Sequence, residues 1–441
     1  MKHTLRLLAV CISICVMATA QDGLRRRADL GMQLGSPMAG ETGAVVRDVK
    51  PGSAAAAAGI ANGDRILKIN GQALSDEIAV DKAISALRGG DAAAFEISRG
   101  SQRMQKQVKL AEMPREVIPG VQAIYSFVTS SRGQRLRTIL TRPQNARGPL
   151  PAVLLGAWLS CDSVEAPLGP SPGDGMAQLL RAIAKDSGYV LMRVDPPGRG
   201  DSEGTCADTD FLSELEGYRA GFQALQHSEF VDPNRIVILG MSNGGGYAPL
   251  IAGDAKVAGY ISISGWSKTW FEHMLEIERR RMALDGVSAG EISKRMPGYE
   301  EFYTDYLIHK QTPAEVIRQK PQLKDLWYDQ PAHQYGRPAA FYQQLEDLNL
   351  WAAWEKVDTP VLAIWGEHDW IMSRDDVEKI AALANQKHAG NGRFVALPRT
   401  THGLIKNNTD EYSNRNFDTG SFNSAVVPLV FEWMKTVLAK R

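Results

Sequence analysis

The 441-residue sequence predicts an α/β protein in which a mostly parallel sheet, covered by helices, follows a small separate domain. Two observations predict this class. The chain is longer than one ordinary domain and fits two. Short apolar runs alternate with helical segments through its larger part, whereas the smaller part has its own strand, turn and helix signals. We expect a small β or α+β domain over residues 24–112, a linker over 113–121 and an α/β domain over 122–441.

The composition fits a globular protein, and its charge gives no sign of a macromolecular partner. Lys and Arg number 50, and Asp and Glu also number 50, so nothing indicates binding to nucleic acid or to an acidic surface. No internal stretch is apolar over the length that a membrane span needs. No spacing of Cys and His suggests a zinc site, so we expect neither a metal nor a cofactor.

The first 20 residues have the features of a signal peptide. Lys2 and Arg6 form a positive flank, residues 7–17 form an apolar region, and Ala18-Thr19-Ala20 is a small-residue cleavage site. The mature chain would then begin at Gln21 and be periplasmic or secreted, with no membrane span left after cleavage. An uncleaved membrane anchor is the alternative.

The small domain has strand, turn and helix signals in close succession. An alanine run, Ala54 to Ala58, predicts a short helix ended by Gly59, and Asn70-Gly71 is a strong hairpin signal. Apolar positions recur at helical spacing between residues 78 and 87. Strands are expected at residues 43–49, 65–69, 94–98 and 105–110.

Four short motifs make this segment resemble a bacterial-type PDZ domain. They are Pro51-Gly52-Ser53-Ala54-Ala55, Ala58-Gly59-Ile60, Asn62-Gly63-Asp64 and Ile69-Asn70-Gly71. The resemblance implies a module that adds the C-terminal strand of a partner protein to its own sheet edge. It also implies that a loop containing Leu30, Gly31 and Met32 holds the partner's carboxylate. The alternative is a purely structural domain that positions or gates the rest of the chain.

The large domain begins with two antiparallel strands, at residues 122–129 and 135–141, joined at Ser131-Arg132-Gly133. Strands and helices alternate afterwards, which favours a mostly parallel sheet with helices on both faces. The alternation breaks after residue 264. Residues from about 265 to 354 are helical and aromatic, and Trp266 and Trp270 are the best candidates among them for a pocket.

The sequence Gly240-Met241-Ser242-Asn243-Gly244 follows an apolar, β-branched run and is followed by small residues. This context is typical of a strand, a sharp turn and a helix, with a serine nucleophile exposed in the strained turn. A Cβ at the glycines would clash with the neighbouring strand and helix. A second match, Gly200 to Gly204, lies in a Pro- and Gly-rich loop, so Ser202 is more consistent with a loop residue.

An acid and a histidine follow Ser242 in the order that this kind of site requires. Asp369 lies just past the strand candidate at residues 361–365, with Glu367 as its nearest rival. His402 lies on a loop past another short strand, near the end of the chain. We expect His402 to take the Ser242 proton while Asp369 orients the imidazole.

An oxyanion needs two backbone N–H donors in such a site. The first is expected from Asn243, the residue after the nucleophile. The second is expected from the loop after the strand at residues 152–156, with Trp158 as the candidate and Leu159 close behind.

Cys161 and Cys206 remain after removal of the leader, as an even pair in an oxidising compartment. They follow the third and fourth strands of the large domain. Loops after parallel strands emerge at the same end of a sheet, so we predict a Cys161–Cys206 disulfide that braces the rim of the site. Two buried free thiols are the alternative.

The residues from about 122 to 441 resemble the α/β-hydrolase superfamily. Four elements carry the resemblance: Gly240 to Gly244, Asp195 to Ser202, Gly366-Glu367-His368-Asp369 and Thr401-His402-Gly403. It implies a serine hydrolase in which the segment at about 265–354 is a helical cap over the pocket.

We therefore expect an exported serine hydrolase that cleaves an ester or a related acyl bond of a small-molecule or peptide substrate through an acyl-enzyme. The alternatives are a serine peptidase of the prolyl-oligopeptidase kind and a non-catalytic adaptor that only binds C-terminal peptides.

Overall fold

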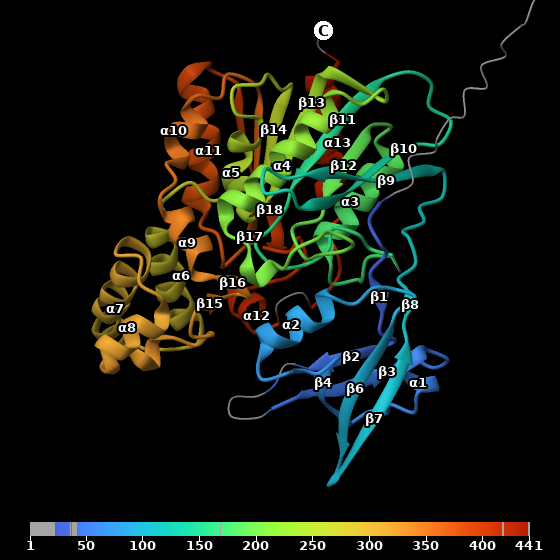
Figure 1. Cartoon of the computed structure of the whole chain (residues 1–441). Coiled ribbons are helices and arrows are strands. Elements are labelled where there is room, and N and C mark those ends of the chain that lie inside the picture. The colour runs from blue at the N-terminus through green and yellow to red at the C-terminus, as the bar shows by residue number, and fades with distance from the viewer. Residues whose placement is uncertain (1–22, 36, 38–41, 168, 417–418, 440–441) are drawn as a thin grey trace, which may run out of the picture.

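A computed structural model describes residues 23–35, 37, 42–167, 169–416 and 419–439. The predicted signal peptide, residues 1–20, lies outside the described residues. The chain forms a large α/β domain and a smaller β-rich domain beneath it in Figure 1. The two domains have separate hydrophobic cores.

The large domain is built on an eight-stranded sheet of order β18-β17-β14-β13-β11-β12-β10-β9. β10 is antiparallel to both neighbours, and the remaining pairs are parallel. The strands are β9 (Val121–Thr129), β10 (Arg135–Pro143), β11 (Leu150–Gly156), β12 (Val190–Val194), β13 (Val231–Met241), β14 (Gly259–Ile263), β17 (Val361–His368) and β18 (Gly392–Thr401). This topology confirms the predicted mostly parallel sheet. The carboxyl ends of the parallel strands therefore meet at one edge of the sheet.

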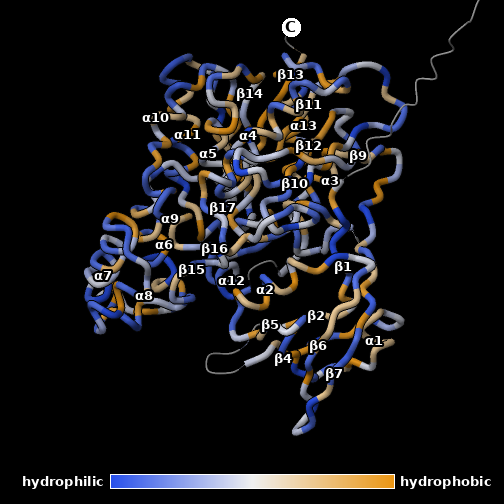
Figure 2. The backbone as a smooth tube through the Cα atoms, viewed as in Figure 1, coloured by the Kyte–Doolittle hydropathy of each residue, from blue (hydrophilic) through white to orange (hydrophobic). Residues whose placement is uncertain are grey.

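The central strands are apolar because helices cover both of their faces. Every residue of β12 and of β14 is buried, and Figure 2 shows hydrophobic segments gathered around β11, β12 and β13. Two helices contact each other on one face, α3 (Gly175–Asp186) and α13 (Val426–Leu438). The other face is covered by α4 (Phe211–Gln226), α5 (Asn243–Ala252), α10 (Leu350–Glu355) and α11 (Arg374–Lys387).

The segment between β14 and β17 is mainly helical, as expected. Its elements are α6 (Trp270–Leu284), α7 (Ala289–Tyr303), the π-helical turn η2 (Thr304–Ile308), α8 (Pro313–Gln319), the 3-10 turn η3 (Pro321–Leu326), β15 (His333–Gln334), β16 (Arg337–Pro338) and α9 (Ala339–Glu346). Capping boxes start α6 at Thr269 and α8 at Thr312. α9 contacts α4, and α10 contacts α5 and α11, so the last part of the segment packs on the helical layer of the large domain.

The small domain is a curled sheet of order β2-β3-β4-β6-β7, with β5 paired to β4. Its strands are β2 (Met32–Gly35), β3 (Ala44–Val49), β4 (Arg65–Ile69), β5 (Gln72–Ala73), β6 (Ala92–Arg99) and β7 (Gln102–Lys109). The alanine run forms the helix α1 (Ala54–Ala57), capped by Ser53. The second helix, α2 (Glu77–Ser85), is capped by Asp76 and buries Val80 and Ala83.

A two-stranded stalk joins the small domain to the large one. β1 (Ala28–Asp29) pairs with β8 (Ala111–Glu112) in antiparallel fashion, so the chain reaches and leaves the small domain side by side (Figure 1). In addition, α2 contacts the 3-10 turn η1 (Cys206–Asp208) of the large domain. The small domain therefore touches the large one near the loops at the carboxyl edge of the main sheet.

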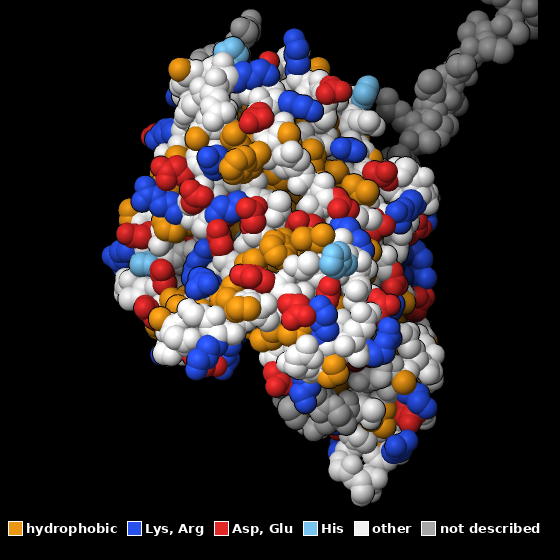
Figure 3. All heavy atoms as spheres, turned by 90° about the vertical axis from the view of Figure 1, so that its left-hand side faces the viewer, with side chains coloured by type: hydrophobic (Ala, Val, Ile, Leu, Met, Phe, Trp, Pro, Cys, Tyr) orange, Lys and Arg blue, Asp and Glu red, His pale blue; other side chains and the backbone are white. Residues whose placement is uncertain are grey.

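The charged side chains on the face drawn in Figure 3 agree with the balanced composition. Figure 3 shows basic and acidic side chains interspersed over one face. Among the described residues, no helix combines the length and the apolar character that crossing a bilayer requires. The same residues contain no cluster of His, Cys, Asp and Glu suited to hold a metal ion.

Candidate active site

Ser242 lies in a strained turn between β13 and α5. Its backbone has φ 54° and ψ −119°, a conformation that residues other than glycine rarely adopt. A Cβ at Gly240 would lie 2.2 Å from the carbonyl oxygen of Gly244, and a Cβ at Gly244 would lie 2.2 Å from that of Gly156. The glycines thus let strand and helix approach closely enough to form the turn.

Asp369 and His402 meet Ser242 at the same edge of the sheet. His402 Nε2 lies 2.9 Å from Ser242 Oγ. His402 Nδ1 lies 3.1 and 3.0 Å from the two carboxylate oxygens of Asp369. The serine follows β13, the acid follows β17 and the histidine follows β18, so residues far apart in sequence form a Ser–His–Asp chain of hydrogen bonds.

Backbone contacts fix the Asp369 carboxylate in this chain. Its Oδ1 accepts the backbone N–H groups of Ile371 and Met372 at 3.0 and 2.9 Å. The side chains of Asp369 and His402 are 0% and 8% exposed. Because these contacts leave the carboxylate little freedom, it holds the imidazole ring in one orientation.

The rival residues have other roles. Ser202 is buried, accepts the backbone N–H of Arg137 at 2.8 Å and donates to the carbonyl oxygen of Asp195 at 3.0 Å. The carboxylate of Glu367 is exposed and accepts the backbone N–H of Arg399. Both side chains therefore stabilise loops.

Two backbone N–H groups belong to residues that line the cleft of Ser242. Among the described residues, the backbone N–H groups of Asn243 and Trp158 have no acceptor. Asn243 is the first residue of α5, where the helix dipole favours negative charge. The pair can therefore receive an oxyanion.

Trp266, expected at the pocket, lies beneath it. The residue is fully buried and does not line the cleft. Its Nε1 donates to the side-chain oxygen of Asn243 at 2.9 Å, so it orients the residue that follows Ser242. Sequence spacing could not reveal this contact, because it joins a residue after β14 to the start of α5. Trp270 does line the cleft, as expected.

The cleft above Ser242 has a volume of about 630 Å³. Its apolar lining includes Trp158, Leu159, Trp270, Met274, Ile277 and Ile371. Three of these come from α6 of the inserted segment, so this segment does form one wall of the pocket. Polar side chains in the lining include Asp162, Asp174 and His273. The site therefore suits a largely apolar group with some polar atoms.

His273 also lines the cleft, and the sequence did not predict this position. It is 4% exposed, and its ring lies 4.8 Å from the ring of Trp270. Burial lowers the pKa of His273 to about 4, and the nearby charges of Asp376 and Arg280 have smaller, opposing effects. The imidazole is therefore neutral at physiological pH and can both donate and accept a hydrogen bond.

Cys161 and Cys206 form the predicted disulfide, with Cα atoms 6.1 Å apart. Cys161 lies in the loop after β11, which also carries Trp158. Cys206 begins η1, in the loop after β12. The bond thus joins two loops at the rim of the cleft.

The predicted peptide-binding loop connects β1 to β2 in the small domain. Leu30 and Met32 are partly buried on the small core, and Gly31 has φ +64°. β2 is an edge strand that, among the described residues, has no strand on its other side, so a peptide strand could be added there. The N–H of Gly31, however, donates to the side chain of Asp29 at 2.9 Å. One of the loop's expected carboxylate donors is therefore already occupied.

Several solved structures are similar to this chain at low sequence identity. Est1E from Butyrivibrio proteoclasticus, solved with bound ferulic acid, is 17% identical, with 71% of this chain and 99% of that chain covered and a TM-score of 0.46. The Pyrococcus furiosus esterase Pf2001 is 12% identical, with 74% and 97% covered and a TM-score of 0.42. The hypothetical protein PA2218 from Pseudomonas aeruginosa is 16% identical, with 72% and 95% covered and a TM-score of 0.43. No curated protein matches the chain.

Two family models match the chain in succession. The PDZ domain model matches residues 28–110. The model of the alpha/beta hydrolase family matches residues 131–414, which is more than half of the 441 residues. The protein is therefore a member of the alpha/beta hydrolase family that carries an N-terminal PDZ domain.

Proposed function

We propose that the protein is a serine hydrolase that cleaves an ester or a related acyl bond through an acyl-enzyme. The observation that carries this proposal is the hydrogen-bonded chain Ser242–His402–Asp369 at the floor of the cleft. The two unpaired N–H groups of Asn243 and Trp158 beside it support the proposal, because acyl transfer needs donors for the oxyanion.

The reaction begins when Ser242 Oγ attacks the substrate's carbonyl carbon and His402 Nε2 takes the hydroxyl proton. Asp369 stabilises the imidazolium, and the N–H groups of Asn243 and Trp158 stabilise the oxyanion. Collapse of the tetrahedral intermediate breaks the bond to the leaving alcohol, which departs with the proton from His402. Water then gives a proton to His402 and attacks the acyl-enzyme, which releases the acid and restores Ser242.

A fluorophosphonate probe tests the nucleophile directly. We expect a covalent adduct on the peptide that contains Ser242, seen by mass spectrometry, and no adduct on Ser242→Ala. That variant should keep the fold and lose at least ~10³-fold of kcat on a p-nitrophenyl ester. Ser202→Ala, the matched control from the second motif, should still be labelled. An unlabelled but folded wild-type protein would favour the adaptor instead.

The apolar lining of the cleft supports an apolar or aromatic group next to the scissile bond. A panel of p-nitrophenyl esters and aminoacyl anilides tests this preference. We expect turnover of the esters, with kcat/KM rising with the size of the apolar group. Preferential cleavage of the anilides would support the peptidase alternative.

We also propose that the protein is exported and that the PDZ domain binds peptides or gates the hydrolase. The leader-like residues 1–20 support export, and so does the disulfide, because such bonds persist in oxidising compartments. Fractionation of cells followed by N-terminal sequencing tests it: a mature chain that begins at Gln21 in the exported fraction is expected. A chain that keeps residues 1–20 would contradict cleavage.

A further inference from the structure

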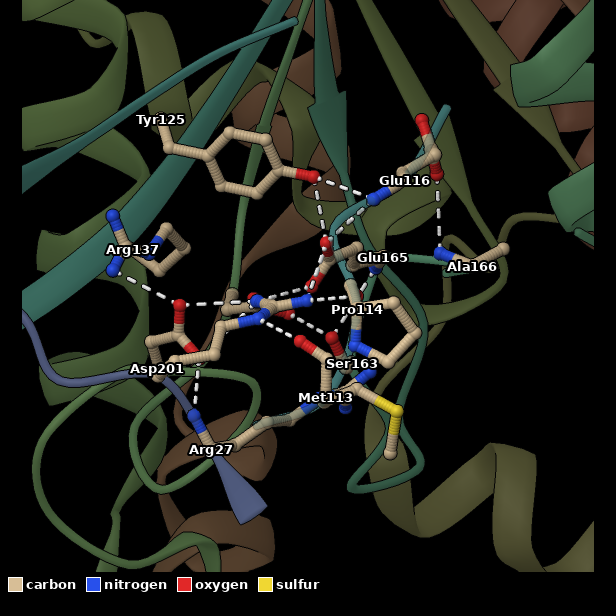
Figure 4. Close-up of polar contacts among 12 residues, drawn as sticks. Arg27, Met113, Pro114, Glu116, Tyr125, Arg137, Ser163, Glu165, Ala166 and Asp201 are labelled. Atoms are coloured by element: carbon tan, nitrogen blue, oxygen red, sulfur yellow. Dashed lines mark hydrogen bonds and ion pairs between the residues drawn. The ribbon is translucent and has the colours of Figure 1, made fainter. Parts of the chain in front are cut away.

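Arg26 precedes the PDZ domain in the chain, yet its side chain is 6% exposed and lies in the hydrolase. Its guanidinium donates to Glu165 at 2.7 and 2.8 Å and to Asp201 at 3.1 and 3.2 Å. It also donates to the carbonyl oxygens of Met113 and Pro114 at 2.7 and 2.5 Å. Figure 4 shows these four partners converging between the domains. One side chain thus joins both connections of the PDZ domain to the hydrolase.

Glu165 depends on this contact more than Asp201 does. The Glu165 side chain is 0% exposed, and among the described residues its other donors are the hydroxyl of Tyr125 at 2.6 Å and the backbone N–H of Glu116 at 3.2 Å. Asp201 has a second cation, Arg137, at 3.0 Å. A buried carboxylate without a cation is costly, so loss of Arg26 would displace Glu165 before Asp201.

Glu165 lies in the loop after β11, the loop that also provides the Trp158 N–H and one wall of the cleft. The adjacent part of the loop is held by the buried Asp195, which accepts the hydroxyl of Ser163 and the backbone N–H of Val164, both at 2.8 Å. Arg26 and Asp195 therefore fix the middle of the loop whose first part carries one of the two expected oxyanion donors.

We propose that Arg26 is a positioning residue for the hydrolytic reaction, acting through Glu165 on the loop that provides the Trp158 N–H. The proposal rests on the proposed serine hydrolase function. It makes the segment that leads into the PDZ domain a part of the hydrolytic site, although no residue of that segment from 23 onward lines the cleft.

A second set of contacts lies between the PDZ domain and the loop after β12. Lys82 and Asp81 of α2 form ion pairs with Asp208 and Arg199 of the hydrolase at 2.7 and 2.5 Å. Asp208 ends η1, whose first residue, Cys206, is bonded to the loop after β11. The PDZ domain is therefore linked to the loop after β11 by Arg26 and, indirectly, through the loop after β12 and the disulfide.

The test compares Arg26→Lys and Arg26→Met with Arg25→Met. Arg25 is the adjacent residue, but it is exposed and pairs with Asp91 inside the PDZ domain, so it is a matched control. In Arg26→Met we expect kcat on a p-nitrophenyl ester and the rate of fluorophosphonate labelling to fall at least ~10-fold, with KM within about threefold. Arg26→Lys should lie between Arg26→Met and the wild type, because lysine keeps the charge but loses the bidentate contact. Arg25→Met should match the wild type.

Glu165→Gln is the second variant of the test, and it still tests the proposal if Arg26→Met does not fold. If Arg26 acts through Glu165, the kcat losses of the two variants will be non-additive when they are combined. Folded Arg26→Lys and Glu165→Gln proteins with wild-type kcat and labelling rate would overturn the inference, as would additive losses. A wild-type protein that the probe does not label would instead overturn the proposed function, so the two failures are distinguishable.

Discussion

His273 brings a second imidazole to the cleft of Ser242, and the two histidines differ in what surrounds them. His402 is bonded on both ring nitrogens, to Asp369 and to Ser242. The ring of His273 instead packs against that of Trp270. A polar side chain on an otherwise apolar wall is well placed to select substrates that bear a hydrogen-bonding group.

The protonation of His273 should make the fold sensitive to acid. Burial lowers its folded-state pKa from 6.5 to about 4, so between these values the unfolded chain binds a proton that the folded protein does not. Stability is then complete above pH ~6.5 and falls by about 3 kcal/mol as the pH drops through 4. In His273→Gln this loss should be absent. Urea unfolding of both proteins across this pH range measures the difference.

The control for this prediction is His388→Gln, which removes an exposed histidine. Its stability should follow the wild type at every pH. An unchanged acid sensitivity in His273→Gln would show that other groups cause it.

At the scale of single elements, the ends of strands were the most informative part of the sequence. That Asp369 and His402 meet Ser242 could be predicted, because each lies a few residues past a short apolar run and parallel strands end at the same edge. Trp266 could not be placed, because its contact with Asn243 depends on how the inserted segment leaves β14. The end of the inserted helical segment could not be predicted from the sequence either. α10 is rich in aromatic residues like that segment, but it packs on α5 and α11.

The loop before β2 leads to a prediction about peptide binding. Asp29→Ala removes the acceptor of the Gly31 N–H and frees this donor for a peptide carboxylate. Affinity for labelled peptides with a free C-terminal valine should rise by about 1 kcal/mol, roughly fivefold. Fluorescence anisotropy with the same peptides as C-terminal amides measures the contribution of the carboxylate, because amides should gain nothing.

Asp48→Ala serves as the control, since it removes an exposed negative charge from the same domain. An equal gain for Asp48→Ala would assign the effect to net charge. No gain for Asp29→Ala would mean that the loop is not a carboxylate site.

At the scale of the whole molecule, the two domains contact each other at the loops after β11 and β12. These contacts could not be predicted from the sequence. Arg26 and Glu165 lie 139 positions apart, and no periodicity or motif links them, because their pairing depends on how the domains dock. The disulfide could be predicted from the sequence, because its two cysteines follow neighbouring parallel strands of one domain.

The disulfide should stabilise the molecule substantially. Its cysteines are 45 positions apart, and closing a loop of that size is worth about 4 kcal/mol in the chain-entropy model. Cys161→Ser/Cys206→Ser should therefore unfold at a clearly lower urea concentration. The two single variants should match the double variant. Thiol titration of the unreduced, unfolded chain that begins at Gln21, which has only Cys161 and Cys206, should find no free thiol. Two reactive thiols would contradict the bond.

The stalk at the base of the PDZ domain also has a practical use. Ala28 pairs with Glu112 and Asp29 with Ala111, and facing residues in an antiparallel ladder have Cα atoms about 5 Å apart. A tight hairpin could therefore splice Asp29 to Ala111 and leave Arg26, Met113 and Pro114 in their places. The PDZ domain could then be removed or exchanged as a unit, while Arg26 keeps its contacts with Glu165 and Asp201 in the remaining hydrolase domain.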